Sequence, residues 1–384
     1  MRFRLAVMQA FRGLTMCGTG RLGFREYTCA EHGAELIPNS CRRRDCPRCV
    51  GARSWRWCEM VEARLLDCPH FHVVFTLPGV LHPYWRHNRK AMADLLFEAA
   101  ARSLGQLLAD PRYMGGIPAM LGVLHTHGSA LTLHPHVHFV LSSVGLRRPG
   151  TLVWVTRPET LLPYGVLRRK FQLEFLHRLK RLADEPGFCP PTDTTALQLH
   201  KIIDGLFKLR HRKWNVMVFL RKDVRPVIRY LSATVYGGPI RNTRIVAVTP
   251  EQVTFLYRDW RDQEESISGT LPPMKERRVH LNEFVQMWSE HISEPGMKTV
   301  RYWGLLSPGY TILLDLARAA LGQSPAPEEH SSSEPVPEPA VRCFKCAAVM
   351  TVRELPRSEL QFSPEASAII RARAPPWFPW AAAS

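Results

Sequence analysis

Three histidines alternate with other residues in the segment 134–138, and their spacing is that of a metal site. His134, His136 and His138 lie two residues apart and lead into an apolar run. Since alternate residues of a β-strand point to the same face, a strand here would project all three imidazoles together. Two or three imidazoles on one rigid strand need only one more ligand to hold a divalent metal. The alternative is a core strand with satisfied histidines, but three in alternation favour the metal site.

A second set of metal-ligand residues lies near the N-terminus, where two short pairs are separated by a loop. This arrangement is typical of a tetrahedral structural zinc site with three cysteines and one histidine. The predicted ligands are Cys29, His32, Cys46 and Cys49. Cys41 and Cys17 are alternates that could replace His32. The competing interpretation is a reduced cysteine cluster without a metal.

A further pair, Cys343-x-x-Cys346, has no second pair near it in the sequence. Alone it is compatible with an incomplete site, a site completed by a partner, or no site at all. The chain holds ten cysteines, several of them in such short spacings. This usage favours metal binding in a reducing compartment over a disulfide framework.

Basic residues are in excess and gather near both candidate sites. The chain has 51 Lys and Arg against 34 Asp and Glu, a formal net charge of +17. Such an excess favours a polyanionic partner, of which nucleic acid is the first candidate. The arginines expected to contact phosphates are Arg42, Arg43 and Arg44 in the zinc loop, and Arg225, Arg229, Arg241 and Arg244 around a helix predicted at 226–235.

Tyr230, in that same helix, is the candidate nucleophile. Val227, Leu231 and Val235 form one apolar stripe of the helix, and Tyr230 lies at its edge. A tyrosine in such a place is usually a packing residue whose hydroxyl meets water. Beside a metal that polarises a phosphodiester, the same hydroxyl could instead attack phosphorus in a strand-transfer reaction. Tyr236 is the fallback, although the helix turns it to the opposite side.

Strands and helices interleave through most of the chain, which predicts an α+β fold. Strands are expected at 72–77, 120–125, 134–142, 214–220, 244–248 and 253–257, and helices at 88–109, 165–182, 226–235, 281–292 and 311–321. With 384 residues, 45% of them hydrophobic, the chain is long enough for more than one domain.

Four regions are expected along the chain. Residues 1–65 are rich in cysteine and arginine and are predicted to form a zinc-binding, DNA-binding module. Residues 66–262 are predicted to be the core, 263–323 a C-terminal helical extension, and 324–384 a disordered linker and tail that contains the CxxC pair. No apolar run is long enough to span a membrane and no secretory signal is evident, so we expect a cytoplasmic protein.

These motifs, in this order, resemble those of the bacterial rolling-circle transposases of the HUH class, the insertion-sequence type with an N-terminal zinc-binding domain, and their common-region relatives. The resemblance runs from Cys17 to Leu306 and rests on the segments 40–49, 72–78, 124–126, 134–138, 230–231, 244–245, 283–284 and 301–306. The segment before Cys17 is shorter than the family leads us to expect, which indicates a truncated or misassigned start.

The resemblance implies a ferredoxin-like HUH endonuclease core, with an antiparallel sheet, that acts on single-stranded DNA. His136 and His138 would hold Mg²⁺ or Mn²⁺, and the third ligand is open between His125 and His134. An all-histidine set would also accept softer metals. Family members commonly carry a second cysteine where His32 stands, and zinc accepts either residue.

Tyr230 corresponds to the family's nucleophile. In members with two tyrosines the second follows four residues later, where this chain has Thr234, so the chain resembles a single-tyrosine variant. The expected function is a DNA transposase that nicks and rejoins single-stranded DNA at the ends of its element through a 5′-phosphotyrosine intermediate. The alternatives are a plasmid replication initiator or relaxase with the same chemistry, and a catalytically inactive, zinc-dependent DNA-binding relative.

The expected partners follow from this interpretation. They are single-stranded DNA and the terminal sequences of the element, met in the bacterial nucleoid and without a membrane. Because a single tyrosine must serve both strand transfers, the site is either reused or supplied by another protomer, and the oligomeric state is left open.

Overall fold

A six-stranded antiparallel sheet carries the histidine strand at its centre. The computed structural model describes residues 3–147, 150–191, 195–208, 214–259, 273–327 and 341–356. The strand order is β11-β4-β5-β3-β7, with β6 paired to β5. These strands are β3 (His70–Thr76), β4 (Ile117–His127), β5 (Leu133–Arg147), β6 (Thr151–Trp154), β7 (Asn215–Arg221) and β11 (Val300–Gly304). The predicted α+β class with an antiparallel sheet is therefore confirmed.

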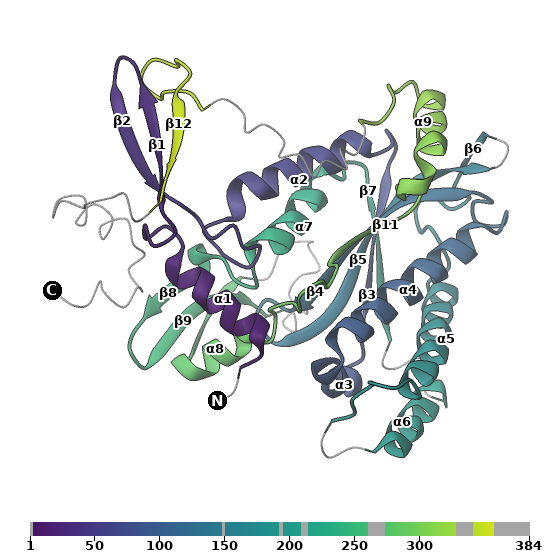
Figure 1. Ribbon diagram of the computed structural model, residues 1–384. Coiled ribbons are helices and arrows are strands. Elements are labelled where there is room, and N and C mark those ends of the chain that lie inside the picture. Colours follow the sequence, from purple (N-terminus) through teal and green to yellow (C-terminus); the bar gives the residue numbers. More distant parts are fainter. Residues whose placement is uncertain are drawn as a thin grey trace.

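Helices cover both faces of this sheet (Figure 1). One face carries α3 (His82–His87), α4 (Arg89–Leu108), α5 (Tyr164–Ala183) and α6 (Ala196–Lys208), and the other carries α2 (Val50–Arg64), α7 (Arg225–Gly237) and α9 (Thr311–Ala320). Among the described residues, no helix combines the length and the apolar character that crossing a membrane would require.

The strand period of two divides the sheet's side chains between two hydrophobic cores. In β4, Met120 and Leu124 pack in the core under α4, whereas Leu121 and Val123 pack in the core under α7. The two cores explain why β3, β4 and β5 read as nearly continuous apolar runs, since both faces of these central strands are buried. The period also decides where the histidines point: those of β5 at even positions share the α7 side with Val140.

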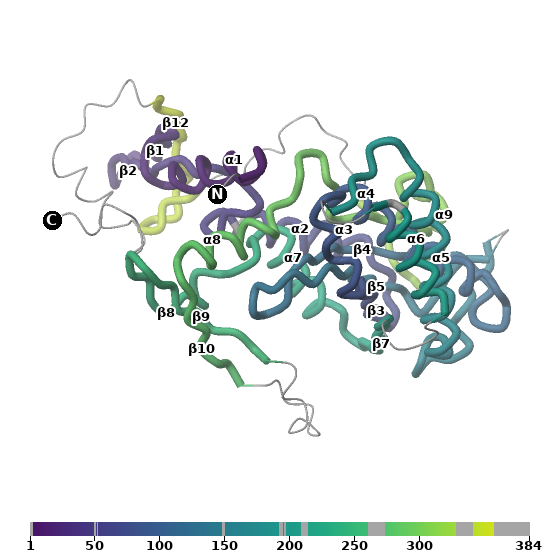
Figure 2. The backbone as a smooth tube through the Cα atoms, turned by 90° about the horizontal axis from the view of Figure 1, so that it is seen from below, coloured from purple at the N-terminus to yellow at the C-terminus, as the bar shows by residue number. Residues whose placement is uncertain are grey.

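Two smaller sheets lie beside the main one (Figure 2). The first has the order β10-β9-β8, formed by β8 (Ile245–Val248), β9 (Gln252–Arg258) and β10 (Met274–His280), and it packs with α1 (Leu5–Met16) and α8 (Leu281–Ser289). The second has the order β12-β1-β2, formed by β1 (Phe24–Cys29), β2 (Gly33–Pro38) and β12 (Thr351–Leu355).

Three elements pair or pack across the expected domain boundaries. Helix α2, from the expected N-terminal module, packs on the main sheet beside α7. The expected helical extension contributes two strands, because β10 pairs with β9 and β11 pairs with β4. Within the expected disordered tail, residues 341–356 are ordered against the N-terminal hairpin, where β12 pairs with β1. Residues 260–272, 328–340 and 357–384 lie outside the described residues.

Gly304, at the end of β11, offers a test of how tightly the edge strand is docked. Its φ is +56°, and an added Cβ would collide with the carbonyl oxygen of Pro118 on β4. We expect Gly304→Ala to lower the free energy of unfolding by about 3 kcal/mol, because strain and a backbone clash add. Urea denaturation measures the change. The control is Gly309→Ala, whose added Cβ meets no atom within 4 Å; equal stability of the two variants would contradict the expectation.

Candidate functional site: a histidine triad facing a tyrosine

Three histidines from two neighbouring strands meet on the α7 side of the main sheet. His125 of β4 lies directly opposite His136 of β5 in the antiparallel register, and His138 follows on the same face. One ring nitrogen of each can be chosen so that all three lie within 4.8 Å of one another. The three residues are only 2%, 8% and 5% exposed. Of the two candidates for the third position, the structure brings His125 to the pair, whereas His134 is exposed and outside the group.

Hydrogen bonds leave the triad with nitrogen lone pairs that have no protein partner. Nδ1–H of His136 donates to the carbonyl oxygen of His134 at 2.6 Å, so its Nε2 carries a free lone pair. Nδ1 of His138 is 2.8 Å from Nε2 of His72 on β3. In the described structure the Nε2 atoms of His125 and His138 are buried without a hydrogen-bond partner. Buried, unpartnered imidazole nitrogens that face one another fit a divalent metal ion.

Burial keeps these imidazoles neutral. Desolvation lowers the pKa of His136 to about 3 and that of His72 to about 4. Desolvation also holds the pKa values of His125 and His138 well below the usual range. Metal ligation needs the neutral form of imidazole, and the triad is in that form at neutral pH without any further proton loss.

Tyr230 of α7 faces this triad. Its ring centroid lies 5.7 Å from that of His125 and 5.9 Å from that of His138. The helix is held in place by Ile228 and Leu231, which are fully buried on the sheet, while Tyr230 remains 54% exposed. Partial burial of the Tyr230 side chain raises its pKa, because burial disfavours the charged phenolate. The hydroxyl is therefore protonated at neutral pH and accessible from solvent.

Tyr236, the fallback nucleophile, lies on the other side of the helix. Its ring packs 6.5 Å from that of Trp57 on α2. Burial raises its pKa, and the nearby Arg53 and Arg44 act in the opposite direction. The structure thus brings Tyr230, and not Tyr236, to the histidines.

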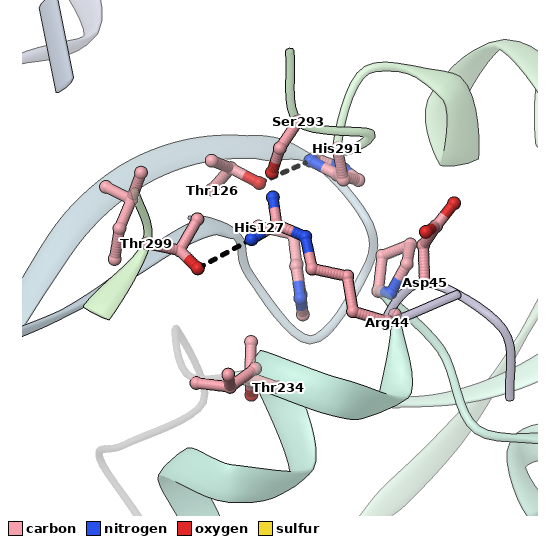
Figure 3. A pocket seen from close by; sticks show the side chains of 12 residues that line it. Arg44, Asp45, Thr126, His127, Thr234, His291, Ser293 and Thr299 are labelled. Carbon is pink, nitrogen blue, oxygen red and sulfur yellow. Dashed lines mark hydrogen bonds between the residues drawn. The ribbon is translucent and has the colours of Figure 1, made fainter. Parts of the chain in front are cut away.

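Thr234, one turn after Tyr230, lines a small pocket next to the triad (Figure 3). Arg44 enters this pocket from the loop after β2 and donates to Oγ1 of Thr299 at 2.8 Å. On the opposite wall, Nδ1 of His291 lies 3.2 Å from Oγ1 of Thr126. The cysteine-rich region is therefore docked directly against the sheet that carries the histidines.

Several arginines expected to contact phosphate already have protein partners. Arg43 pairs with Asp45 at 3.2 Å and Arg225 with Asp223 at 2.9 Å. Arg244 donates to the carbonyl oxygens of Leu256 and Ser129. Arg44 is likewise held by Thr299, so both Arg43 and Arg44 of the zinc loop have protein partners. Arg229 and Arg241 are exposed.

Arg42 lines a separate, wider hollow beside the cysteines. The other basic side chains that line it are Arg25, Arg53 and Arg56. Tyr27 and Asn39 also contribute to its wall. Four arginines in the lining of one hollow favour an anionic occupant.

The cysteines form two groups, which corrects the predicted zinc ligand set. The first group brings Cys46 and Cys49 together with both alternates, Cys17 and Cys41. The second group holds Cys29 and His32. The physical reason is that Cys29 and His32 sit at the tip of the β1–β2 hairpin, whereas Cys17 follows α1 and reaches the loop that carries the other cysteines.

The first group has the dimensions of a tetrahedral thiolate site. The Sγ atoms of Cys17 and Cys49 are 3.6 Å apart, those of Cys41 and Cys49 3.7 Å, and those of Cys17 and Cys46 3.6 Å. Zinc–sulfur bonds of about 2.3 Å in a tetrahedron separate the sulfurs by about 3.8 Å. Hydrogen bonds with Cys41, which has the largest effect, and with Cys46 lower the pKa of Cys17 to about 7.

Comparison with known proteins finds transposase families that match both the cysteine-rich N-terminal region and the region that carries the histidine triad. The family described as a putative transposase matches residues 119–311, and the family described as a transposase zinc-binding domain matches residues 2–77. The chain is 32% identical over 331 residues to the putative transposase y4qJ of Sinorhizobium fredii, covering 84% of this chain and 81% of that protein. It is 29% identical over 304 residues to the transposase for insertion sequence element IS801 of Pseudomonas savastanoi pv. phaseolicola, covering 76% and 68%.

Among solved structures, TrwC complexed with a 27-mer DNA comprising its recognition hairpin and cleavage site is similar to 43% of this chain and 71% of that one, at 14% identity. The TM-score of 0.24 is too low to support an argument about the fold.

The matches together define a transposase, as the sequence predicts. The chain belongs to the family of insertion-sequence transposases that carry an N-terminal zinc-binding domain.

Three residues that lie around the triad, His72, His127 and His291, are not predicted by the sequence patterns. His72 begins the strand predicted at 72–77, and a histidine in a mostly apolar run was the available signal. His127 follows His125 by two residues, and His291 lies after α8, far from the triad in sequence. His127 and His291 come together because β4 packs against the segment after α8, and local sequence patterns do not encode that packing.

The buried state of His291 predicts a pH-dependent stability. Desolvation lowers its pKa to about 4, from an unfolded value near 6.5, so its contribution to stability is present above pH 6.5 and is lost as the pH falls toward 4. For this one group the loss at pH 5 is about 2 kcal/mol. We expect His291→Gln, which keeps a donor and an acceptor but does not titrate, to weaken the pH dependence by that amount. Urea denaturation at pH 8 and pH 5 measures it; identical pH profiles of parent and variant would contradict the assignment.

Proposed function

We propose that this transposase cuts and rejoins single-stranded DNA at the ends of its element, with Tyr230 as the nucleophile. The observation that carries the proposal is the position of the Tyr230 ring, 5.7 and 5.9 Å from two histidines whose Nε2 atoms are buried and unpartnered in the described structure. A hydroxyl next to a divalent-metal site is the arrangement that phosphodiester transfer requires.

The reaction balances without an external energy source. The hydroxyl oxygen of Tyr230 forms a bond to the scissile phosphorus, the bond from phosphorus to the 3′-oxygen breaks, and the tyrosine proton passes to solvent while the 3′-oxygen gains one. The products are a 5′-phosphotyrosine and a free 3′-hydroxyl. A 3′-hydroxyl of the element or of the target then attacks the phosphotyrosine and releases Tyr230, because the ester retains the energy of the broken bond.

The three imidazoles are the proposed ligands of Mg²⁺ or Mn²⁺, and the donor set also accepts softer metals. When bound, such a metal would stabilise charge on the non-bridging phosphate oxygens. His72 acts as a positioning residue, since its 2.8 Å contact with Nδ1 of His138 holds that ring with Nε2 toward the other two.

We further propose that the N-terminal module holds its structural zinc with Cys17, Cys41, Cys46 and Cys49. Support comes from the tetrahedral sulfur spacing and from the match of this region to a zinc-binding domain. The basic hollow around Arg42, together with the exposed Arg229 and Arg241, offers contacts for the phosphates of the DNA. Arg44 is assigned a different role, because its contact with Thr299 ties the module to the core.

With Thr234 in place of a second tyrosine, one nucleophile serves both strand transfers in this proposal. The second transfer then requires either that Tyr230 be released and used again or that a second protomer contribute its own Tyr230. The two routes differ in the number of active sites that the protein–DNA complex needs: one if Tyr230 is reused, and two if a second protomer takes part.

A covalent-adduct assay tests the nucleophile. We expect Tyr230→Phe to lower adduct formation by roughly three orders of magnitude, because phenylalanine has no oxygen to attack phosphorus. Full-length protein, single-stranded DNA from the element's ends and Mn²⁺ are incubated and run on denaturing gels. Tyr236→Phe is the matched control on the same helix and should keep the adduct. An adduct that persists in Tyr230→Phe and disappears in Tyr236→Phe would reverse the assignment.

Removal of one triad member tests the metal site separately from DNA binding. We expect His136→Ala to lower nicking about 100-fold or more while changing the Kd for DNA less than about threefold, since phosphate contacts dominate affinity. His134→Ala is the control, because its side chain is exposed on the same strand and outside the triad. Nicking assays and fluorescence anisotropy give the two readouts. Normal nicking by His136→Ala would remove the triad from the mechanism.

A further inference from the structure

We propose that Cys29, His32, Cys343 and Cys346 form a second zinc site, which fastens the C-terminal segment 341–356 to the N-terminal hairpin. The four ligand atoms lie within 4.8 Å of one another. This group shares no residue with the group of Cys17, Cys41, Cys46 and Cys49. The zinc-binding domain matched by this chain ends at residue 77, so half of the proposed site lies far outside it.

The distances are those of a tetrahedral site. Sγ of Cys29 lies 3.6 Å from Nδ1 of His32 and 3.6 Å from Sγ of Cys346. Sγ of Cys343 lies 3.7 Å from Nδ1 of His32. Zinc bonds of about 2.3 Å to sulfur and 2.0 to 2.1 Å to nitrogen give tetrahedral edges of about 3.6 to 3.8 Å. Three soft thiolates and an imidazole select zinc over Mg²⁺ or Ca²⁺, which prefer oxygen ligands.

The two halves of the site repeat the same backbone turn. In each, two ligands are separated by two residues, and the residue after the second ligand has a left-handed backbone: φ is +79° at Gly33 and +59° at Ala347. In the C-terminal turn the N–H of Ala347 donates to the carbonyl oxygen of Cys343 at 2.8 Å. An alanine with positive φ is strained, and it persists where its neighbours impose the turn. Two ligands drawn to one ion provide that constraint.

Strand pairing brings the halves together. β12 runs antiparallel to β1, with Thr351 opposite Thr28 and Leu355 opposite Phe24. The two turns therefore lie at the same end of the sheet, as Figure 1 shows for β1, β2 and β12. Arg25 and Glu354 form an ion pair across these strands at 3.1 Å.

This sheet has too little apolar burial to hold the tail by itself. In β12 only Leu355 is buried, and β2 has no fully buried residue. By contrast, Cys29 and Cys343 are 2% and 4% exposed. Small sheets with so little core are commonly stabilised by a structural metal, whose binding free energy becomes folding free energy.

Zinc content tests the proposal without reference to DNA cleavage. Full-length protein is purified under reducing conditions and its zinc per chain is measured by mass spectrometry of the metal. We expect the double variant Cys343→Ser/Cys346→Ser to hold one zinc ion fewer than the parent. The matched control, Cys68→Ser/Cys189→Ser, also removes two thiols but lies outside both groups, and it should hold as much zinc as the parent. Equal zinc content in the parent and the Cys343→Ser/Cys346→Ser variant overturns the proposal.

A conservative exchange keeps the test valid if the double variant misfolds. His32→Cys should keep the full zinc content, because zinc accepts four thiolates. In the Co²⁺-substituted full-length protein, the same exchange should strengthen the thiolate-to-cobalt absorption, since a nitrogen ligand becomes sulfur. An unchanged cobalt spectrum in His32→Cys would show that His32 is not a ligand and would overturn the proposal.

Discussion

The register between β4 and β5 is the constraint on which the candidate site depends. His125 lies opposite His136, with His138 next on the same face. Because side chains alternate along a strand, a slip of one residue would turn the β5 histidines toward α4 and away from Tyr230. The slip is prevented by burial on both faces, where Val137 and Phe139 pack under α4 while Val140 packs under α7. The same apolar layers that stabilise the sheet thus fix the geometry of the polar group.

Burial has two consequences for this group. It removes water from the imidazoles, which keeps them neutral, and it leaves the Nε2 atoms of His125 and His138 without hydrogen bonds in the described structure. Unsatisfied buried nitrogens cost free energy, and a bound ion would offset that cost. The zinc module adds a second constraint, because Arg44 reaches the pocket beside the triad and bonds Thr299. Module and core are therefore in contact at the pocket beside the triad.

Local patterns predicted the parts of the site that depend on one segment. The alternation at 134–138 predicted a strand with histidines on one face, and the stripe of Val227, Leu231 and Val235 placed Tyr230 at the edge of its helix. The division of the cysteines into two groups depends instead on which segments meet in space. The pairing of β1 with β12 brings Cys29 close to Cys343, although most of the chain separates them in sequence. Spacing rules apply only to residues that are near one another in sequence. His72 and His291 were missed for the same reason.

The pairing of β12 with β1 sets the order in which the protein can be completed during synthesis. β1 ends at Cys29 and β12 begins at Thr351, so the N-terminal hairpin leaves the ribosome long before its third strand is made. At about 5 to 20 residues per second the delay is roughly 20 to 60 s. During that time β1 presents an open edge. A chain cut short before Thr351 by a stop codon or a frameshift keeps that edge permanently, because the strand that covers β1 is never made.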